Sequence, residues 1–347
     1  MTGTLPKFGR RALPDNPALV SQSVRPGKTL PWIVKASRPD LALNDWLDDN
    51  MAEIDARLLK HGAILFRGFR PRDLAGFQKT TEKLTRTLLK DYGDLPKEDA
   101  QGDIYKSTPY PADKMILFHN ESSHLTCWPT RQFFMSVIVA KSGGETPIVD
   151  CRQVLQALPR HITDPLLALG LCYVRTFVPN FDVSWQAFFK TDVRAEADAL
   201  CRAAGMEPAW RGEDIMQVRN RAPAVIRHPV TGEMSFFNQI ALHHPSCLDV
   251  EVRMSMESFL GPDALPRNVT YGDGTPIPDA HVAEIGRVMD DLSVADPWNE
   301  GDLIMLDNML VAHARRPFSG PRKIVVVLGD PVSLDQVECP SSLQEQV

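Results

Sequence analysis

Several features that would place the chain in other functional classes are missing from its 347 residues. Residues 1–7 lack the apolar run of a signal peptide, and the longest aliphatic stretch, Ile324–Leu328, is far too short to cross a bilayer. None of the six cysteines forms a C-x-x-C pair, so neither a zinc knuckle nor a redox dithiol is indicated. The net charge is −6 and the basic residues are scattered, which argues against a nucleic-acid partner. We therefore expect a cytoplasmic protein that acts neither on nucleic acid nor in a membrane.

The order of the predicted elements indicates the fold class. The strand-like runs are not regularly followed by crossover helices, which argues against a doubly wound parallel sheet. A mixed α/β protein with a mainly β core fits better, namely a double-sheet jelly roll with helices packed outside. The expected strands are Ala63–Gly68, Phe133–Ala140, Leu303–Leu306 and Lys323–Leu328. The expected helices are Leu41–Lys60, Arg72–Leu89, Arg152–Leu158, Arg194–Ala204, Val250–Phe259 and Asp279–Leu292.

Internal repeats and low-complexity tracts are absent, and the prolines are spread along the chain. Residues 1–30 are rich in Pro, Arg and Ser without periodicity, so we expect an extended arm there. Residues 31–335 are expected to form one domain, followed by a tail over residues 336–347.

The first chemical motif is His119-Asn120-Glu121. In extended backbone, residues i and i+2 point to the same side, so the imidazole and the carboxylate can hold one metal ion together. A second histidine, His313, follows a strand near the C-terminus and completes a 2-His-1-carboxylate set. Such a set leaves positions open for a co-substrate and for oxygen, and is typical of non-haem iron(II) oxygenases. The first motif alone is common by chance, so the prediction rests on the two motifs together.

An arginine and a threonine complete the pattern. Arg322 lies nine residues after His313 and enters the next strand, where its guanidinium can bind a carboxylate in bidentate fashion. A diacid that chelates iron at its keto-acid end, 2-oxoglutarate, has such a distal carboxylate. Thr146 follows Gly143-Gly144, and its hydroxyl is a candidate hydrogen-bond partner of the same co-substrate, although this segment also suits an ordinary β-turn.

Together these pieces resemble the TauD/TfdA-type 2-oxoglutarate-dependent dioxygenases, and within them the SyrP-like and clavaminate-synthase-like members. The resemblance covers roughly residues 60–330. The segments that carry it are Gly62–Phe69, His119-Asn-Glu121, Gly143-Gly-Glu-Thr146, Ser184-Trp-Gln186, Phe237-Asn-Gln239 and His313–Phe318.

The resemblance implies a double-stranded β-helix core with flanking helices and a helical insertion at about residues 175–300. It assigns Fe(II) to His119, Glu121 and His313, and 2-oxoglutarate to Thr146 and Arg322, with O2 as the oxidant. Because Glu121 is present, halogenation is not expected. The spacing from His313 to Arg322 is shorter than in TauD-like enzymes, so Arg315 or Arg316 is a second candidate for the co-substrate, or a solvated turn residue.

The resemblance also suggests the substrate, an amino acid or amino-acid derivative that is free or tethered to a carrier protein. Hydroxylation in secondary metabolism is the expected reaction. Desaturation, epoxidation or oxidative cyclisation on the same site is an alternative, and a non-catalytic jelly-roll binding protein is another. A zinc hydrolase is disfavoured because no H-E-x-x-H motif occurs. A homo-oligomer is compatible with the sequence.

Candidate substrate-pocket residues flank these motifs, and for each of them packing within the core is the competing interpretation. The candidates are Asn120, Ser122, Ser123, Trp185, Gln186, Asn238, Gln239, His243 and His244. Adjacent residues in a strand point in opposite directions, so we do not expect His243 and His244 to bind one ion together.

Overall fold

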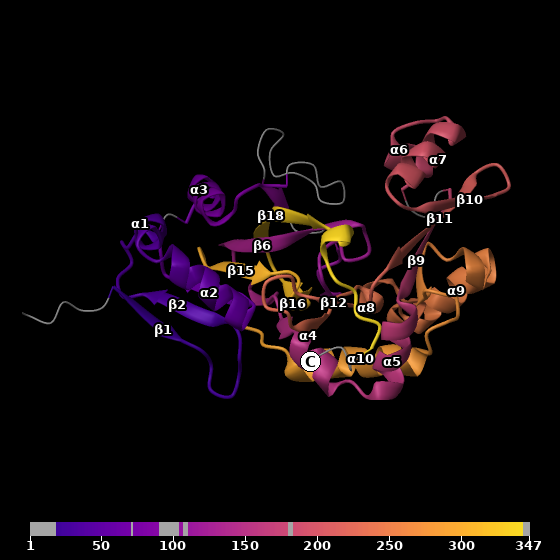
Figure 1. Ribbon diagram of the computed structural model, residues 1–347. Helices are drawn as coiled ribbons and strands as arrows, with labels where there is room; N and C mark the ends of the chain where they lie inside the picture. Colours follow the sequence, from indigo (N-terminus) through magenta and orange to yellow (C-terminus); the bar gives the residue numbers. More distant parts are fainter. Residues whose placement is uncertain (1–18, 71, 90–103, 107–109, 180–182, 343–347) are drawn as a thin grey trace, which may run out of the picture.

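The computed structural model describes residues 19–70, 72–89, 104–106, 110–179 and 183–342 (Figure 1). Most of the predicted N-terminal arm, residues 1–18, and the last five residues of the predicted tail lie outside the described residues. Within the described part of the arm, β1 (Val20–Ser23) pairs antiparallel with β2 (Trp32–Ala36) and so extends the main sheet by one strand.

The main sheet has seven strands in the order β1-β2-β3-β15-β6-β18-β4. Its pairings are antiparallel except for the parallel pair β2 and β3. The five strands not yet defined are β3 (Ala63–Arg67), β4 (Tyr105–Lys106), β6 (Cys127–Ile138), β15 (Leu303–Asp307) and β18 (Lys323–Ser333). The four predicted strands correspond to β3, β6, β15 and β18, and so are confirmed.

A second, three-stranded sheet has the order β5-β16-β8. It consists of β5 (Ile116–His119), β16 (Val311–Arg315) and β8 (Ile148–Asp150). The short strands β7 (Ser142–Gly143) and β17 (Phe318–Ser319) pair beside it. The chain passes from β15 in the main sheet to β16 in this second sheet through residues 308–310 alone. Side chains of both sheets, among them Leu65, Phe134, Ile148, Ile304 and Val311, form one apolar cluster.

Both faces of the main sheet are buried. In β15, Ile304 and Leu306 belong to the cluster shared with the second sheet, whereas Leu303 and Met305 pack in another cluster with the N-terminal helices. This period of two is the ordinary alternation of a strand. Because both faces are covered, the strand reads as a continuous apolar run, which is what made it recognisable in the sequence.

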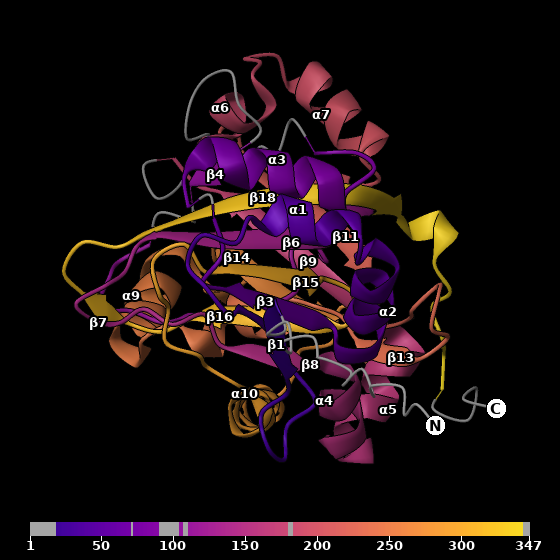
Figure 2. The same ribbon diagram turned by 90° about the vertical axis from the view of Figure 1, so that its left-hand side faces the viewer.

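Helices cover the outer face of this sheet: α1 (Leu43–Asp48), α2 (Met51–His61) and α3 (Leu74–Leu84) (Figure 2). The single helix expected over Leu41–Lys60 is therefore two helices, interrupted at Asp49-Asn50. The predicted stop at Gly62 is confirmed, because this residue caps α2 with a left-handed φ of 69° that suits glycine.

A second group of helices packs against the β5-β16-β8 sheet, and three of them, α4, α5 and α10, lie lower than β16 in Figure 1. It comprises α4 (Cys151–Ala157), α5 (Arg160–Leu169), α8 (Ile240–His243) and α10 (Asp279–Leu292). The helices expected at Arg152–Leu158 and Asp279–Leu292 are confirmed as α4 and α10.

The region predicted as a helical insertion also contains a sheet. Four antiparallel strands have the order β10-β11-β9-β14: β9 (Leu171–Phe177), β10 (Glu207–Arg211), β11 (Ile215–Ala222) and β14 (Arg267–Tyr271). Around it lie α6 (Trp185–Phe189), α7 (Arg194–Ala203), α9 (Val250–Leu260) and the hairpin β12 (Val225–Arg227) and β13 (Met234–Phe236). Polar and charged residues interrupt β10 and β11, so their apolar pattern is weak, and sequence analysis identified only α7 and α9 here. In the described part of the chain, no helix has the length and apolar character needed to span a membrane.

Candidate active site

Two neighbouring strands of the smaller sheet bring the predicted metal ligands together. His119 is the last residue of β5 and lies directly opposite His313 of β16 in the antiparallel register. Their ring centroids are 4.3 Å apart. Glu121 lies in the turn that follows β5, and not in the extended backbone that the sequence suggested. One ligand atom from each of His119, Glu121 and His313 nevertheless lies within 4.8 Å of the other two, so the three side chains can share one ion.

The backbone of Glu121 is fixed by the turn between β15 and β16. The side-chain oxygen of Asn308 accepts the amide proton of Glu121 at 2.7 Å, and its Nδ2 donates to the Glu121 carbonyl at 2.9 Å. In return, Nδ2 of Asn120 donates to the carbonyls of Asn308 and Val311. Both asparagines are fully buried. These reciprocal bonds join the segment that carries two ligands to the segment that leads to the third.

The hydrogen bond of His119 and the burial of His313 favour the forms of these imidazoles that can bind a metal ion. Nδ1 of His119 donates to the carbonyl of Leu117 at 2.8 Å, which leaves Nε2 as the lone-pair donor. Burial and the neighbouring His119 hold the pKa of His313 well below its usual value, so this ring is neutral as a metal ligand must be. Nδ1 of His313 is buried and has no hydrogen-bond partner among the described residues. Two neutral imidazoles and one carboxylate suit a divalent iron ion.

Gln132 of β6 borders the carboxylate ligand. Its Nε2 donates to Oε2 of Glu121 at 3.3 Å, and its own Oε1 is buried without a partner among the described residues. Sequence analysis did not single out Gln132, because a glutamine inside an apolar strand has no motif around it. Its bond to Glu121 is of the kind that orients a metal-binding carboxylate.

One pocket contains both the three candidate metal ligands and the residues predicted for the co-substrate. Its lining includes Thr146 and Arg322 together with the three candidate ligands. Nε of Arg322 donates to the carbonyl of Gly144 at 2.9 Å. Burial and the nearby Arg315 lower the pKa of Arg322 to about 10, so the guanidinium keeps its charge at neutral pH. Among the described residues, no carboxylate forms an ion pair with Arg322, and a bound acid would supply its counter-charge.

The glycines before Thr146 make room for this arginine. Gly144 has a φ of 76°, and a Cβ placed on it would lie 3.0 Å from both Cδ and Nε of Arg322. A Cβ on Gly143 would lie 2.2 Å from the carbonyl oxygen of Pro317. The two glycines therefore have a role beyond forming a turn. Because they lack side chains, this segment can lie close to Pro317 and to Arg322.

Of the two further arginines, Arg315 and not Arg316 reaches the pocket. Arg315 is buried, and its guanidinium donates to the carbonyls of Tyr110, Pro111 and Lys114. Arg316 turns away and pairs with Asp290 at 2.6 Å. The co-substrate role suggested for Arg316 is thus not supported. Successive residues of a strand point to opposite sides, and Arg315 shares the inward side with His313.

Several predicted substrate residues are instead part of the buried support of the ligand loop. Ser123 and Gln239 both donate from their side chains to the carbonyl of Asn120, at 2.9 Å each. Asn238 donates from its backbone to Oδ1 of Asn120 and from its side chain to the carbonyl of Ala224. None of Asn120, Ser123, Asn238 and Gln239 lines the pocket of the metal ligands. Their hydrogen-bonding groups serve the protein itself, so the prediction of substrate contact is replaced by a positioning role. Ser122 is likewise buried and lies outside this lining.

The other candidates lie farther away. Trp185 and Gln186 belong to α6, at the far end of the insertion from β16 (Figure 1), and they line a separate cavity. Nδ1 of His243 faces the Gln239 carbonyl and its ring contacts Tyr173, whereas His244 bonds Ser246 and the Ile277 carbonyl. The two rings therefore bond to different groups, and His243 is the last residue of helix α8, not part of the strand that the sequence argument assumed.

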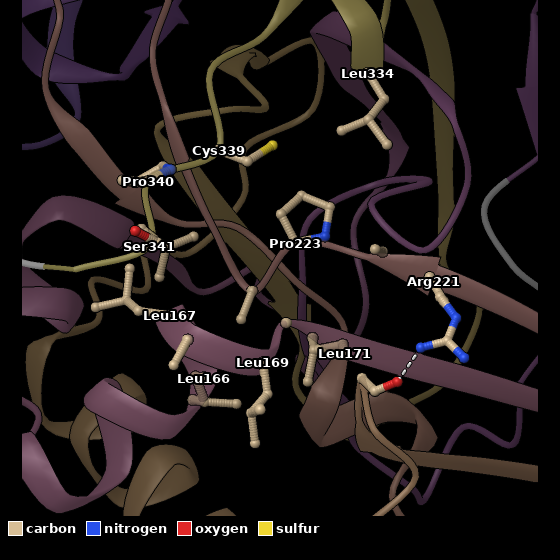
Figure 3. A pocket seen from close by; sticks show the side chains of 16 residues that line it. Leu166, Leu167, Leu169, Leu171, Arg221, Pro223, Leu334, Cys339, Pro340 and Ser341 are labelled. Carbon is tan, nitrogen blue, oxygen red and sulfur yellow. Dashed lines mark hydrogen bonds between the residues drawn. The ribbon is translucent and has the colours of Figure 1, made fainter.

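An apolar cavity of about 330 Å³ lies between the end of α5, the start of β9 and the C-terminal segment (Figure 3). Leu166, Leu169 and Leu171 line it, and Arg221 at its edge donates to the Gly272 carbonyl. None of the candidate metal ligands borders this cavity, so the chemistry belongs to the smaller pocket described above.

Comparison with known proteins identifies the family. Residues 23–328 match the model of the taurine catabolism dioxygenase TauD, TfdA family. The chain belongs to this family. It is 34% identical over 302 residues to the dapdiamide synthesis protein DdaC of Enterobacter agglomerans, with 86% of this chain and 91% of DdaC covered. A clavaminate synthase-like protein of Arabidopsis thaliana is 29% identical over 287 residues, covering 79% of this chain and 83% of the relative.

A solved structure with low sequence identity has the same overall fold as this TauD/TfdA member. PvcB of Pseudomonas aeruginosa superposes with a TM-score of 0.55 at 14% identity, covering 96% of this chain and 98% of PvcB. The predicted strand-rich fold with surrounding helices is thereby confirmed. The family match likewise confirms the predicted class of enzyme, a dioxygenase of the TauD/TfdA type.

Proposed function

We propose that the protein uses iron(II), 2-oxoglutarate and O2 to hydroxylate an amino acid or amino-acid derivative. One observation carries the proposal: a His-Glu-His set, in which both histidines are buried, and an arginine without an acidic partner among the described residues line the same pocket. His119, Glu121 and His313 would hold the iron, and Arg322 and Thr146 the distal carboxylate of 2-oxoglutarate. The bound metal supplies activated oxygen; the protein supplies orientation and a dry pocket.

The wall of the pocket suits this role. Phe134 stacks near His313 with ring centroids 5.0 Å apart, and Ile116, Ile324 and Val326 add apolar surface. Such a lining excludes water from the ligands and strengthens the interaction of Arg322 with an anion. The carboxylate of Glu121 occupies the place that a halide would need, which favours hydroxylation over halogenation.

The relatives support a role in making a small natural product, since DdaC is named for dapdiamide synthesis and the Arabidopsis protein for clavaminate synthase. PvcB is described as an iron, 2-oxoglutarate-dependent oxygenase from an isonitrile pathway. Whether the substrate is free or tethered to a carrier protein is part of the proposal to be tested. The cytoplasmic location and a possible homo-oligomer stay predictions from the sequence.

Turnover with a substrate panel tests the proposal. Enzyme loaded with Fe(II) and 2-oxoglutarate is exposed to air with free amino acids and with the same aminoacyl groups as carrier-protein thioesters, and succinate and product mass are measured. We expect succinate in equal amount to a product heavier by one oxygen atom, and no product with His313→Ala. A product lacking two hydrogens would favour desaturation or ring closure instead. No substrate-dependent succinate with any compound would count against an amino-acid substrate.

A further inference from the structure

The hydroxyl of Thr146 has one partner among the described residues, the indole of Trp298. Nε1 of Trp298 donates to Oγ1 of Thr146 at 3.3 Å. An indole N–H can only donate, so the threonine oxygen is the acceptor in this bond. The hydroxyl proton of Thr146 is consequently left for a different acceptor.

No described residue accepts that proton, although Thr146 is buried. A buried donor without a partner is unfavourable, and an acceptor that arrives with a ligand would remove the cost. Thr146 lines the pocket of Arg322 and the candidate metal ligands on one side. On the other side it shares a small cavity with Trp298 and Arg67. The indole thus approaches the hydroxyl from the side of this second cavity, which leaves the side toward Arg322 for the proton.

The loop that carries Trp298 is fixed on both sides of the indole. Asp302 is almost completely buried and forms an ion pair with Arg67, the last residue of β3, at 2.7 Å. The same guanidinium donates to the carbonyl of Pro297 at 2.8 Å, and Asp302 accepts the amide proton of Asn299 at 2.8 Å. The residues immediately before and after Trp298 are therefore held by one ion pair, so the indole has a defined place beside Thr146.

We propose that Trp298 is a positioning residue for the co-substrate: its indole N–H fixes the rotamer of the Thr146 hydroxyl so that the hydroxyl donates to the distal carboxylate of 2-oxoglutarate. This inference rests on the proposed function. Arg67 and Asp302 hold the backbone on either side of Trp298, and Trp298 bonds to Thr146, so these contacts then link the main sheet to the co-substrate. It adds a preorganised donor to the charge of Arg322, and preorganised donors lose less entropy when the ligand binds.

The test measures 2-oxoglutarate affinity, not turnover. The Fe(II)-loaded protein is titrated without oxygen, and the dissociation constant is read from the visible band of the chelate. Trp298→Phe keeps an aromatic ring but removes the indole N–H, and we expect about a fivefold weaker binding, the size of one ordinary hydrogen bond. A keto acid without a distal carboxylate, 2-oxobutyrate, should bind equally to both proteins. Trp210→Phe is the matched control, since it removes an indole bond to Asp198 of 2.9 Å in the insertion.

Combining Trp298→Phe with substitutions of Thr146 distinguishes a positioning role from a general loss of structure. In a Thr146→Val background, Trp298→Phe should cause no further loss, whereas in Thr146→Ser, which keeps the hydroxyl, the loss should persist. The inference is overturned if Trp298→Phe binds 2-oxoglutarate like the wild type, or if it weakens Thr146→Val as much as the wild type. If the wild type itself does not bind 2-oxoglutarate, the proposed function fails first and this inference falls with it.

Discussion

Asn308 holds the backbone of Glu121 at both ends of the residue, accepting its amide proton and donating to its carbonyl. The same Nδ2 also donates to the carbonyl of Pro129 at 2.8 Å, so one buried amide joins the ligand turn, the start of β6 and the β15–β16 connection. Glu121 lies in a turn outside any strand. Its position relative to the two histidines therefore depends on this asparagine more than on the sheet.

Replacement of Asn308 by alanine should lower both stability and iron affinity. The change removes the hydrogen bonds that Asn308 makes to the amide and carbonyl of Glu121 and to the carbonyl of Pro129, and we expect the free energy of unfolding to fall by about 3 kcal/mol. Urea unfolding and anaerobic Fe(II) titration measure the two effects. Asn50→Ala serves as a control, since Asn50 makes a single side-chain bond, to the Trp46 carbonyl, outside the site. Unchanged iron affinity in a folded Asn308→Ala protein would contradict the positioning role.

Gly144→Ala should weaken 2-oxoglutarate binding through Arg322. The new methyl group would meet Cδ and Nε of the arginine at 3.0 Å and displace the guanidinium. Gly27→Ala is a suitable comparison, because Gly27 also has a positive φ, 73°, but has nothing within 4 Å of the added Cβ. Both variants carry backbone strain, so only the first should raise the dissociation constant of 2-oxoglutarate. Equal affinities in the two variants would show that the glycine does not position Arg322.

Arg316 and Arg322, in the segment between β16 and β18, should differ in their effect on the co-substrate. Arg322→Lys loses the bidentate geometry for a carboxylate, and we expect at least a tenfold loss of 2-oxoglutarate affinity. Arg316→Lys should leave this affinity unchanged, because Arg316 pairs with Asp290 outside the pocket. Isothermal titration of the metal-loaded variants distinguishes them. A large effect of Arg316→Lys would restore the role that the sequence suggested for it.

The half-buried His243 should make stability depend on pH. Burial, followed by the neighbouring His124, holds its pKa well below 6.5 in the folded protein, whereas the unfolded chain titrates near 6.5. Below that pH the unfolded state binds a proton that the folded state does not. Stability should therefore fall as the pH drops from about 6.5, by up to about 1.4 kcal/mol per pH unit for this residue. Urea unfolding of wild type and His243→Phe between pH 7 and pH 5 should show a smaller slope in the variant; equal slopes would contradict this.

The sequence predicts the candidate site where its residues lie in continuous motifs. His119 and Glu121 are two residues apart, and His313 and Arg322 are nine residues apart, so the proximity within each pair is largely local. The main strands were recognisable because both of their faces are buried. The residues that support the site were not found in the same way. Asn308 and Trp298 contact residues 187 and 152 positions away, and nothing in the sequence near either of them indicates the partner.

Two expectations that the structure does not support have related causes. Arg315 and Arg316 are adjacent, so the choice between them depends on which side of β16 faces the pocket. A shift of one residue along the strand reverses that choice. Asn120 and Gln239 are polar and near the ligands, which suggested substrate contact, but their hydrogen bonds to backbone groups appear only in three dimensions. The strands β10 and β11 were missed because polar and charged residues interrupt the apolar face of a half-exposed sheet.

Anaerobic titration of the protein with Fe(II) and 2-oxoglutarate tests the central claim most directly. The account predicts a weak visible charge-transfer band that requires both components and is absent in His313→Ala. If the folded wild-type protein binds iron but shows no band with 2-oxoglutarate, the oxygenase assignment of this site is wrong, and a jelly-roll protein that binds a ligand without catalysis becomes the better description.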